Sequence, residues 1–233
     1  MHPLTFLPGT LLHETSFSEL QLLLEPHACS IRTEILGACD TFDAELLRLA
    51  HTVELPQVWI GHSLGGIAAI SLAFAAPEKC AAIICIASTA RADAPSNRDK
   101  RLAQLYRART ADSCEPISLE MKPVFGLITG SVLARSLAAQ AARVGVNRFA
   151  NQTDYALTRP DRRDAIAKIT CPILAIVGAD DDICPPELSH EIAALSARAH
   201  ATHVAQIAGA GHLAPMTHAH EVATHITQFL TRL

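Results

Sequence analysis

Ser63 is the side chain best suited to nucleophilic chemistry, because it stands in the segment GHSLG (61–65), which matches the pattern G-x-S-x-G. The apolar residues 58–60 predict a strand before it, and the Ala-rich residues 64–75 predict a helix after it. The turn between them is sharp and strains the serine backbone, so the flanking glycines leave room that a Cβ would fill. The hydroxyl is then expected at the edge of a sheet, in front of a helix N-terminus.

A serine hydroxyl is a poor nucleophile at neutral pH and needs a base, which a carboxylate orients. His212 follows a Gly-Ala-Gly turn after the predicted strand 203–207, and the aspartates 180–182 follow the predicted strand 173–177. Both loops come at the carboxyl ends of strands, and the chain order Ser, Asp, His is the order known for a G-x-S-x-G turn of this kind. The sequence therefore predicts that Ser63 is a nucleophile, with His212 as its base and one of the three aspartates as the orienting carboxylate.

Elsewhere, short apolar runs alternate with amphipathic stretches, which predicts βα units and a parallel sheet. Strands are expected at 4–7, 29–35, 58–60, 82–87, 173–177 and 203–207, and helices at 16–25, 41–51, 64–75, 186–197 and 217–230. Ser16 and Glu19 match a capping box at the start of the first helix. Leu46, Leu47 and Leu49 are expected on the inner side of the second.

The alternation breaks between residues 88 and 170, where helix-like segments occur without a convincing strand. We expect a helical insertion above the carboxyl ends of the strands, the edge at which α/β proteins bind ligands. The insertion holds 14 Lys and Arg against 8 Asp and Glu, a net charge of +6, whereas the remainder carries −10. Either these helices simply expose charged faces, or they form a basic lid that attracts an anionic substrate or an acidic carrier protein.

Composition narrows the class of protein. The chain has 233 residues, of which 49% are apolar and 18% charged, so it can bury the core of one domain. Its formal charge of −4 argues against nucleic-acid binding, and no apolar run approaches the ~20 residues that span a bilayer. Residues 1–14 lack a basic leader, and seven scattered cysteines favour reduced thiols. We expect a cytoplasmic protein that binds neither nucleic acid nor a membrane.

Metals and cofactors are not expected. His218, His220 and His225 fall on the last predicted helix, but they lack the i, i+4 spacing of a helical metal pair. We interpret them as surface residues.

Together these features resemble the α/β-hydrolase family over nearly the whole chain, with residues 88–170 matching the family's variable cap. The segment LPGTLL (7–12) resembles its oxyanion loop, in which a His-Gly pair is usual and Pro8 here replaces the histidine. The family's acid generally fits G-x-x-D-x-x-x-P, which places it on Asp181, with Asp180 and Asp182 as alternatives.

The resemblance implies an α/β-hydrolase fold, with a core at 1–87 and 171–233 and a helical cap at 88–170. Because the oxyanion loop arrives by residue 8, the sheet should be short: about six parallel strands, without the antiparallel edge usual in the family. The resemblance also implies a triad and an oxyanion hole. The triad would be Ser63, Asp181 and His212, and the oxyanion donors would be the backbone N–H groups of Thr10 and Leu64.

The resemblance implies hydrolysis of an ester, lactone or thioester of a small or carrier-linked acyl group through an acyl-enzyme on Ser63. A basic lid would favour an anionic or acyl-carrier-linked substrate. Arg91, at the end of the strand 82–87, is the best single candidate to meet a substrate carboxylate, and the alternative is an exposed hinge residue. Arg162 and Arg163, at the other hinge, carry the same two alternatives. His62 is expected to pack rather than to take part.

Two other functions stay open. One is a ligand receptor that uses the pocket of the same fold only for binding. The other is a C–C hydrolase or a lyase that uses the same triad.

Overall fold

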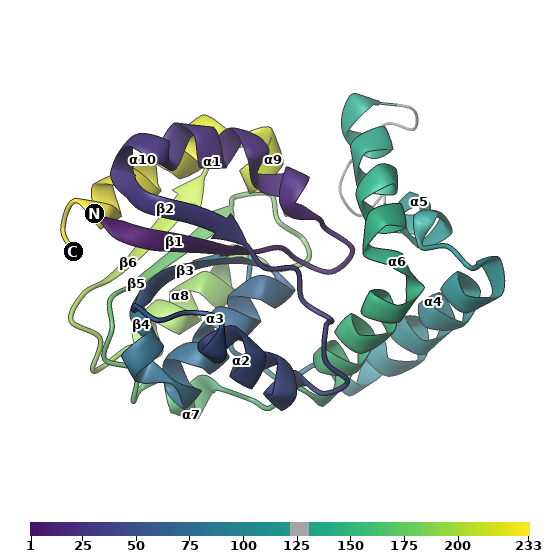
Figure 1. Ribbon diagram of the computed structural model, residues 1–233, viewed down its shortest axis with the longest axis horizontal. Coiled ribbons are helices and arrows are strands. Elements are labelled where there is room, and N and C mark those ends of the chain that lie inside the picture. Colours follow the sequence, from purple (N-terminus) through teal and green to yellow (C-terminus); the bar gives the residue numbers. More distant parts are fainter. Residues whose placement is uncertain (122–130) are drawn as a thin grey trace.

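The computed structural model describes residues 1–121 and 131–233, and a sheet of six parallel strands lies at its centre (Figure 1). The strands are β1 (His2–Leu7), β2 (Ala28–Thr33), β3 (Gln57–His62), β4 (Cys80–Ile86), β5 (Ile173–Gly178) and β6 (Thr202–Ile207). They lie in the order β2-β1-β3-β4-β5-β6, so the order reverses between β1 and β3. The expected α/β architecture is confirmed, and every strand pair in the described residues is parallel.

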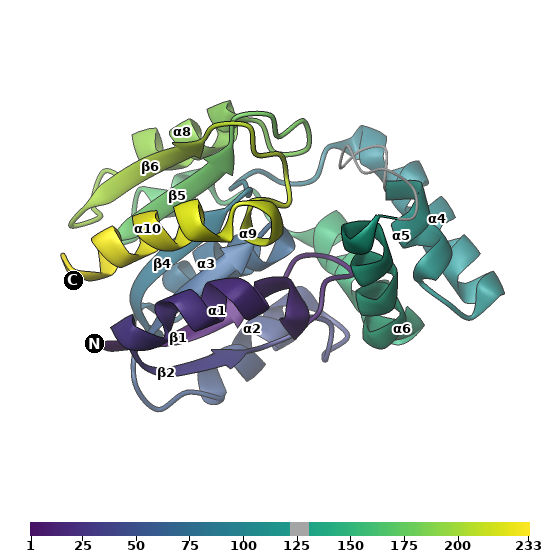
Figure 2. The ribbon, with the colours of Figure 1, turned by 90° about the horizontal axis from the view of Figure 1, so that it is seen from above.

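Helices cover both faces of the sheet. α1 (Ser18–Leu24) and α10 (Ala219–Leu230) lie on one face, and α2 (Phe42–His51), α3 (Leu64–Ala75) and α8 (Pro186–Leu195) lie on the other (Figure 1, Figure 2). Along β4, Ile84 and Ile86 pack into the first layer, while Ile83 and Cys85 pack into the second. Each large apolar side chain buried in this way contributes roughly 1.5–3 kcal/mol, which is why β4 is apolar without interruption.

Two local predictions were wrong. Ser16 does not begin a capping box, because a 3₁₀ turn occupies this position and the Ser16 hydroxyl donates to the carbonyl of His13 at 2.8 Å. Leu47 is 61% exposed, although Leu46 and Leu49 are buried as expected. The expected helix 217–230 is confirmed as α10, and a short helix, α9 (Ala214–Thr217), precedes it. The 3₁₀ helices are Glu14–Phe17, Glu25–His27, Pro77–Lys79 and Pro95–Asn97.

Between β4 and β5 the described residues form only helices: α4 (Arg98–Ala111), α5 (Glu115–Met121), α6 (Val132–Thr158) and α7 (Arg163–Ile166), with the 3₁₀ turn before α4. α4, α5 and α6, which we call the cap, stand beyond the carboxyl ends of the strands (Figure 2). Gly145, with φ 75° and ψ 165°, divides α6 into two segments. No helix in either described stretch is long and apolar enough to cross a membrane. The boundaries 88 and 170 stay a prediction.

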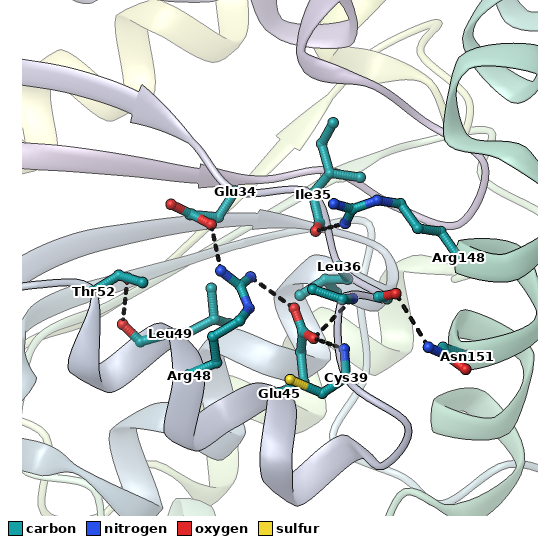
Figure 3. Close-up of polar contacts among 12 residues, drawn as sticks. Glu34, Ile35, Leu36, Cys39, Glu45, Arg48, Leu49, Thr52, Arg148 and Asn151 are labelled. Atoms are coloured by element: carbon teal, nitrogen blue, oxygen red, sulfur yellow. Dashed lines mark hydrogen bonds and ion pairs between the residues drawn. The ribbon is translucent and has the colours of Figure 1, made fainter.

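The second segment of α6 is held to the core by side chains that donate to the loop after β2. The donors are Arg148, Asn151 and Tyr155, and the acceptors are the carbonyls of Ile35, Gly37 and Cys39. Figure 3 shows the Arg148 and Asn151 contacts. This part of the cap is therefore fastened to the sheet layer by hydrogen bonds as well as by packing.

The buried carboxylate of Glu45 fixes the same loop from the other side (Figure 3). It accepts hydrogen bonds from the amides of Ala38 at 3.0 Å and Cys39 at 2.9 Å, from Arg48 at 2.8 Å and from the Tyr155 hydroxyl at 3.1 Å. A charge taken out of water in this way must be paired and hydrogen-bonded. The loop, α2 and α6 therefore share one polar anchor.

Candidate active site

Ser63 lies in the turn between β3 and α3, beside the point at which the strand order reverses. Its φ of 53° and ψ of −115° are strained for a residue with a Cβ. Two bonds to the neighbouring strand and the residues after it hold the turn. The Ser63 amide donates to the carbonyl of Ile86 at 2.9 Å, and the hydroxyl of Ser88 donates to the carbonyl of Ser63 at 2.9 Å.

The glycines on either side of Ser63 are required by close approach of the backbone. A Cβ on Gly61 would overlap the carbonyl of Gly65, and a Cβ on Gly65 would overlap the carbonyl of Leu7 in β1. β1, β3 and α3 therefore meet more closely than a side chain at either position allows. This is the physical reason for the two glycines of the G-x-S-x-G pattern.

His212 and Asp181 form a buried pair, although they are 31 residues apart in the sequence. The Nδ1 atom of His212 lies 2.9 Å from Oδ2 and 3.1 Å from Oδ1 of Asp181, and the two side chains are 6% and 0% exposed. Since the ionised carboxylate can only accept, Nδ1 is the donor, and in the neutral form of the imidazole Nε2 then keeps its lone pair. That tautomer is the one a general base needs.

The Asp181 carboxylate is also held by its own loop. Its Oδ1 accepts from the amides of Ile183 and Cys184, both at 2.9 Å. Burial would raise the pKa of Asp181, but the hydrogen bond and charge of His212, together with the two amides, hold that pKa below its ordinary value. Asp180 and Asp182 are exposed, so only the middle aspartate of the three reaches the imidazole.

His62 packs against His212, as the sequence led us to expect of a packing residue. The ring centroids are 4.9 Å apart, and Nε2 of His62 lies 2.8 Å from the carbonyl oxygen of His212. Because a carbonyl only accepts, Nε2 of His62 must be the donor. Burial lowers the pKa of His62 to about 3, so this second imidazole stays neutral beside the first.

Thr10 and Leu64, the expected oxyanion donors, line one cavity with Ser63. Leu64 is the first residue of α3, so its N–H is among those that a helix leaves without a partner inside the helix. In the part of the chain that the structure describes, the Thr10 amide donates to no other protein group. A Cβ on Gly9 would lie 3.1 Å from the Cβ of Ser63, so the loop passes close to Ser63.

The cavity has a volume of about 360 Å³ and lies between the sheet edge and the cap. Its floor includes Ser63 and His212. Its cap side is lined by apolar and by charged residues, among them Ile117, Leu137, Phe149, Arg101 and Arg159. A volume of this size suits a small organic ligand.

Three charged cavity residues were missed by the sequence reasoning: Asp93, Arg101 and Arg159. Asp93 accepts from Nε of Arg101 at 2.7 Å and from Nη2 of Arg159 at 3.1 Å, so two guanidinium groups share one carboxylate. Burial would raise the pKa of Asp93, but the hydrogen bonds and charge of Arg101 outweigh burial and hold that pKa below its ordinary value. The only signal in the sequence was the basic excess of residues 88–170, which does not single out these side chains.

Arg91 also lines the cavity, but its guanidinium forms two 2.9 Å hydrogen bonds with Glu191 of α8. Arg162 lies over the ring of Phe74, with its Cζ atom 5.0 Å from the ring centroid, and Arg163 pairs with Asp161 at 2.7 Å. Neither lines the cavity. The hinge arginines are thus placed mainly by contacts within the protein.

Cys184 borders the cavity, where burial raises the pKa of its thiol to about 12. The thiol therefore stays protonated near neutral pH and is a weak nucleophile. Across residues 1–121 and 131–233, His, Cys, Asp and Glu side chains form no group of three or more that could hold a metal ion.

Two known proteins are similar in sequence to much of this chain. It is 26% identical over 202 residues to the pimeloyl-[acyl-carrier protein] methyl ester esterase of Aliivibrio salmonicida (strain LFI1238), which covers 84% of this chain and 76% of that protein. It is 28% identical over 147 residues to the protein of the same name from Neisseria meningitidis serogroup B (strain ATCC BAA-335 / MC58), which covers 60% of this chain. The match covers 57% of the Neisseria protein, little more than half its length.

A solved structure of a thermophilic esterase from Thermogutta terrifontis has the same fold. It matches with a TM-score of 0.83 at 22% identity, over 100% of this chain and 90% of that one. The model of the Alpha/beta hydrolase family matches residues 6–225. Since that match takes in nearly the whole sequence, the chain belongs to the Alpha/beta hydrolase family.

Proposed function

We propose that the protein is a serine hydrolase that cleaves a carboxylic ester, lactone or thioester through an acyl-enzyme on Ser63. The observation that carries the proposal is the buried Asp181–His212 pair, whose imidazole lines the same cavity as Ser63. Three residues from distant parts of the chain thus lie at one sheet edge, and they follow one another in the chain as Ser, Asp and His, the order that accompanies a G-x-S-x-G turn.

In the proposed reaction, Nε2 of His212 takes the proton of the Ser63 hydroxyl as Oγ attacks the acyl carbon. Asp181 holds the imidazole and stabilises the imidazolium that forms. The tetrahedral intermediate then expels the alcohol or thiol, which leaves with the proton from His212. A water molecule then attacks the acyl carbon of the acyl-enzyme and gives a proton to His212. The second tetrahedral intermediate breaks its bond to Oγ of Ser63, which takes that proton back from His212 as the acid leaves.

The negative oxygen of each intermediate needs donors that are already in place. The backbone N–H groups of Thr10 and Leu64 fill this role in our proposal, since both residues line the cavity beside Ser63. Loss of one such donor typically raises the barrier by about 3–4 kcal/mol. The amide of residue 10, and not its side chain, supplies the effect.

An anionic acyl group fits the charge of the cavity. Arg101 and Arg159 contribute two positive charges against the single carboxylate of Asp93, and all three line the cavity with Ser63. Burial lowers the pKa of Arg159, and the negative charge of Asp93 works against this shift. A further negative charge on the substrate would stabilise the charged guanidinium in the same way. We therefore propose a substrate with a carboxylate or similar anion remote from the scissile bond.

An acyl-carrier-linked ester is the finer form of this proposal. Both relatives named above are esterases of a carrier-linked methyl ester. The cap of this chain also offers exposed basic side chains that make no ion pair within the described residues, namely Arg98, Lys100, Arg109 and Arg143. Such a face attracts an acidic carrier protein during encounter.

Arg101→Gln is expected to reduce kcat/KM about tenfold or more for an ester with a remote carboxylate, since a hydrogen bond to a charged group contributes about 1.5–3 kcal/mol. For a neutral ester of equal length, the same change should reduce kcat/KM less than twofold. Rates on neutral, anionic and carrier-linked esters measure this. Arg107→Gln is the matched control, because Arg107 pairs with Glu120 outside the cavity.

Salt adds a second arm to the same measurement. Raising the ionic strength from about 0.05 M to about 0.5 M should weaken the preference for anionic and carrier-linked esters in the wild type. If the rates on neutral and anionic esters were equal and did not change with salt, the charge of the cap would not determine which substrate the protein prefers.

The proposed hydrolase is tested by labelling with a fluorophosphonate, which reacts with an activated serine, followed by a panel of esters, lactones and thioesters. We expect labelling of Ser63 in the folded protein and turnover of at least one class. A ligand receptor on the same fold would leave Ser63 unlabelled. A C–C hydrolase or lyase would be labelled but would leave every ester, lactone and thioester intact.

A further inference from the structure

The loop that carries the Thr10 amide is held by few contacts of its own. It follows β1 without entering a helix or a further strand, and Leu11 has φ 61°, a left-handed conformation that a leucine rarely adopts. Within the loop, the Leu12 amide donates to the carbonyl of Gly9 at 3.1 Å. That bond does not use the amide of Leu11, which needs a partner of its own.

Two glutamines of α6 supply the missing acceptors. The amide of Leu11 donates to Oε1 of Gln152 at 3.0 Å, and the amide of His13 donates to Oε1 of Gln140 at 3.0 Å. The glutamines are 0% and 2% exposed, so both acceptor side chains are buried in the protein. The loop of the core is therefore shaped by side chains of the cap that are more than a hundred residues away in sequence.

Gln152 is the more strongly fixed of the two. Its Nε2 donates to the carbonyl of Leu36 at 3.0 Å, so the two ends of the side-chain amide have different partners and cannot exchange. The same segment of α6 is fastened to the loop after β2 through Arg148, Asn151 and Tyr155. Gln140 lies on the first segment, before Gly145, and among the described residues its Nε2 donates to the Ser136 hydroxyl at 3.2 Å.

The bond to Leu11 acts on Thr10 through the planarity of the peptide group. Fixing the Leu11 N–H also fixes the Thr10 carbonyl, which points the opposite way across a trans peptide. The Leu12 bond fixes the Gly9 carbonyl in the same way, and with it the Thr10 N–H. Both peptide planes on either side of Thr10 are then determined, one by the loop and one by Gln152.

We propose that Gln152 is a positioning residue of the oxyanion hole, which holds Leu11 in its left-handed conformation and so aims the Thr10 amide into the cavity. The inference rests on the proposed hydrolase function. It makes the cap part of the catalytic apparatus as well as a wall of the binding site. Gln152 touches no substrate, since it is not among the residues that line the cavity.

Gln152→Met tests the proposal, because methionine keeps the volume and removes both hydrogen bonds. We expect kcat to fall by about tenfold to a hundredfold, less than the roughly 10²–10³ for complete loss of a donor, with KM within about threefold. Affinity for a trifluoromethyl ketone, which forms a tetrahedral adduct with an oxyanion, should fall by the same factor as kcat/KM. A merely structural role would not link these two quantities.

Gln140→Met is the matched control, since it removes the same type of bond from the same helix but acts three residues beyond Thr10. We expect its kcat within about threefold of the wild type. Equal losses in the two variants, or an unchanged kcat in Gln152→Met, would overturn the role assigned to Gln152. Absence of esterase activity in the wild type would overturn the hydrolase proposal itself, and the inference with it.

If Gln152→Met does not fold, Gln152→Glu decides the question. A protonated glutamate accepts from Leu11 and donates to Leu36 as glutamine does, whereas an ionised one repels the Leu36 carbonyl. The ratio of its kcat to that of the wild type should therefore decline as the pH is raised, with KM nearly constant. A ratio that does not change with pH would contradict the proposal.

Discussion

Replacing Ser63 by alanine is expected to reduce turnover about 10⁵- to 10⁶-fold, because the variant lacks the atom that forms the acyl-enzyme. The free energy of unfolding should change by less than about 1 kcal/mol, since the hydroxyl serves no core packing and the strained turn is held by backbone contacts to β4. Steady-state rates and chemical denaturation measure the two quantities, and fluorophosphonate labelling should disappear.

Ser71→Ala is the control for that experiment. Ser71 lies on α3, the helix that follows the nucleophile, and its buried hydroxyl has no hydrogen-bond partner in the described residues. Its removal should leave turnover within about twofold of the wild type. If Ser63→Ala kept a tenth of the wild-type rate, another group would have to be the nucleophile.

Asp181→Asn is expected to lower kcat by about 10⁴-fold, the loss known for the corresponding change in a serine protease triad. The amides of Ile183 and Cys184 both donate to Oδ1, so an asparagine must keep its oxygen there and turn its NH₂ group toward Nδ1 of His212. The imidazole then carries its proton on Nε2 and is no longer a base toward Ser63.

Asp180→Asn and Asp182→Asn are the matched controls, because these neighbours are exposed and are expected to lose less than about threefold. The measurement is kcat on the best ester of the panel, with circular dichroism to show that each variant is folded. Equal losses in all three variants would contradict the assignment of the acid to the middle aspartate.

The sequence predicted the sheet well, because strands covered on both faces must be apolar throughout. The runs at β4 and β5 differ from their predicted limits by no more than two residues. Helix starts were harder, since Ser16 and Glu19 have the right spacing but a 3₁₀ turn from Glu14 to Phe17 occupies the position. Leu47 was placed on the wrong face of α2, because three leucines within four residues cannot all point inward.

In the candidate site, residues in local sequence patterns were predictable, and residues joined by long-range contacts were not. Ser63, Asp181 and His212 stand in local patterns at strand ends, so the order of the chain is enough to propose them as a triad. Asp93 and Arg159 are 66 residues apart, and Gln152 bonds to an amide 141 residues away. Such contacts depend on how the cap helices are seated, which no local spacing encodes.

The order of strands in the sheet has a consequence for how activity returns after denaturation. β5 and β6 are followed by the loops that carry Asp181 and His212, the proposed acid and base. These two strands come last in the chain and lie together at one margin of the sheet, while β1, β3 and β4 form its middle. Parallel strands pair only after long crossovers have closed, which is slow. During refolding, we therefore expect enzymatic activity to return only when this final unit of β5, α8 and β6 has docked. The helix content of the whole chain would not report this step, because most helices lie elsewhere.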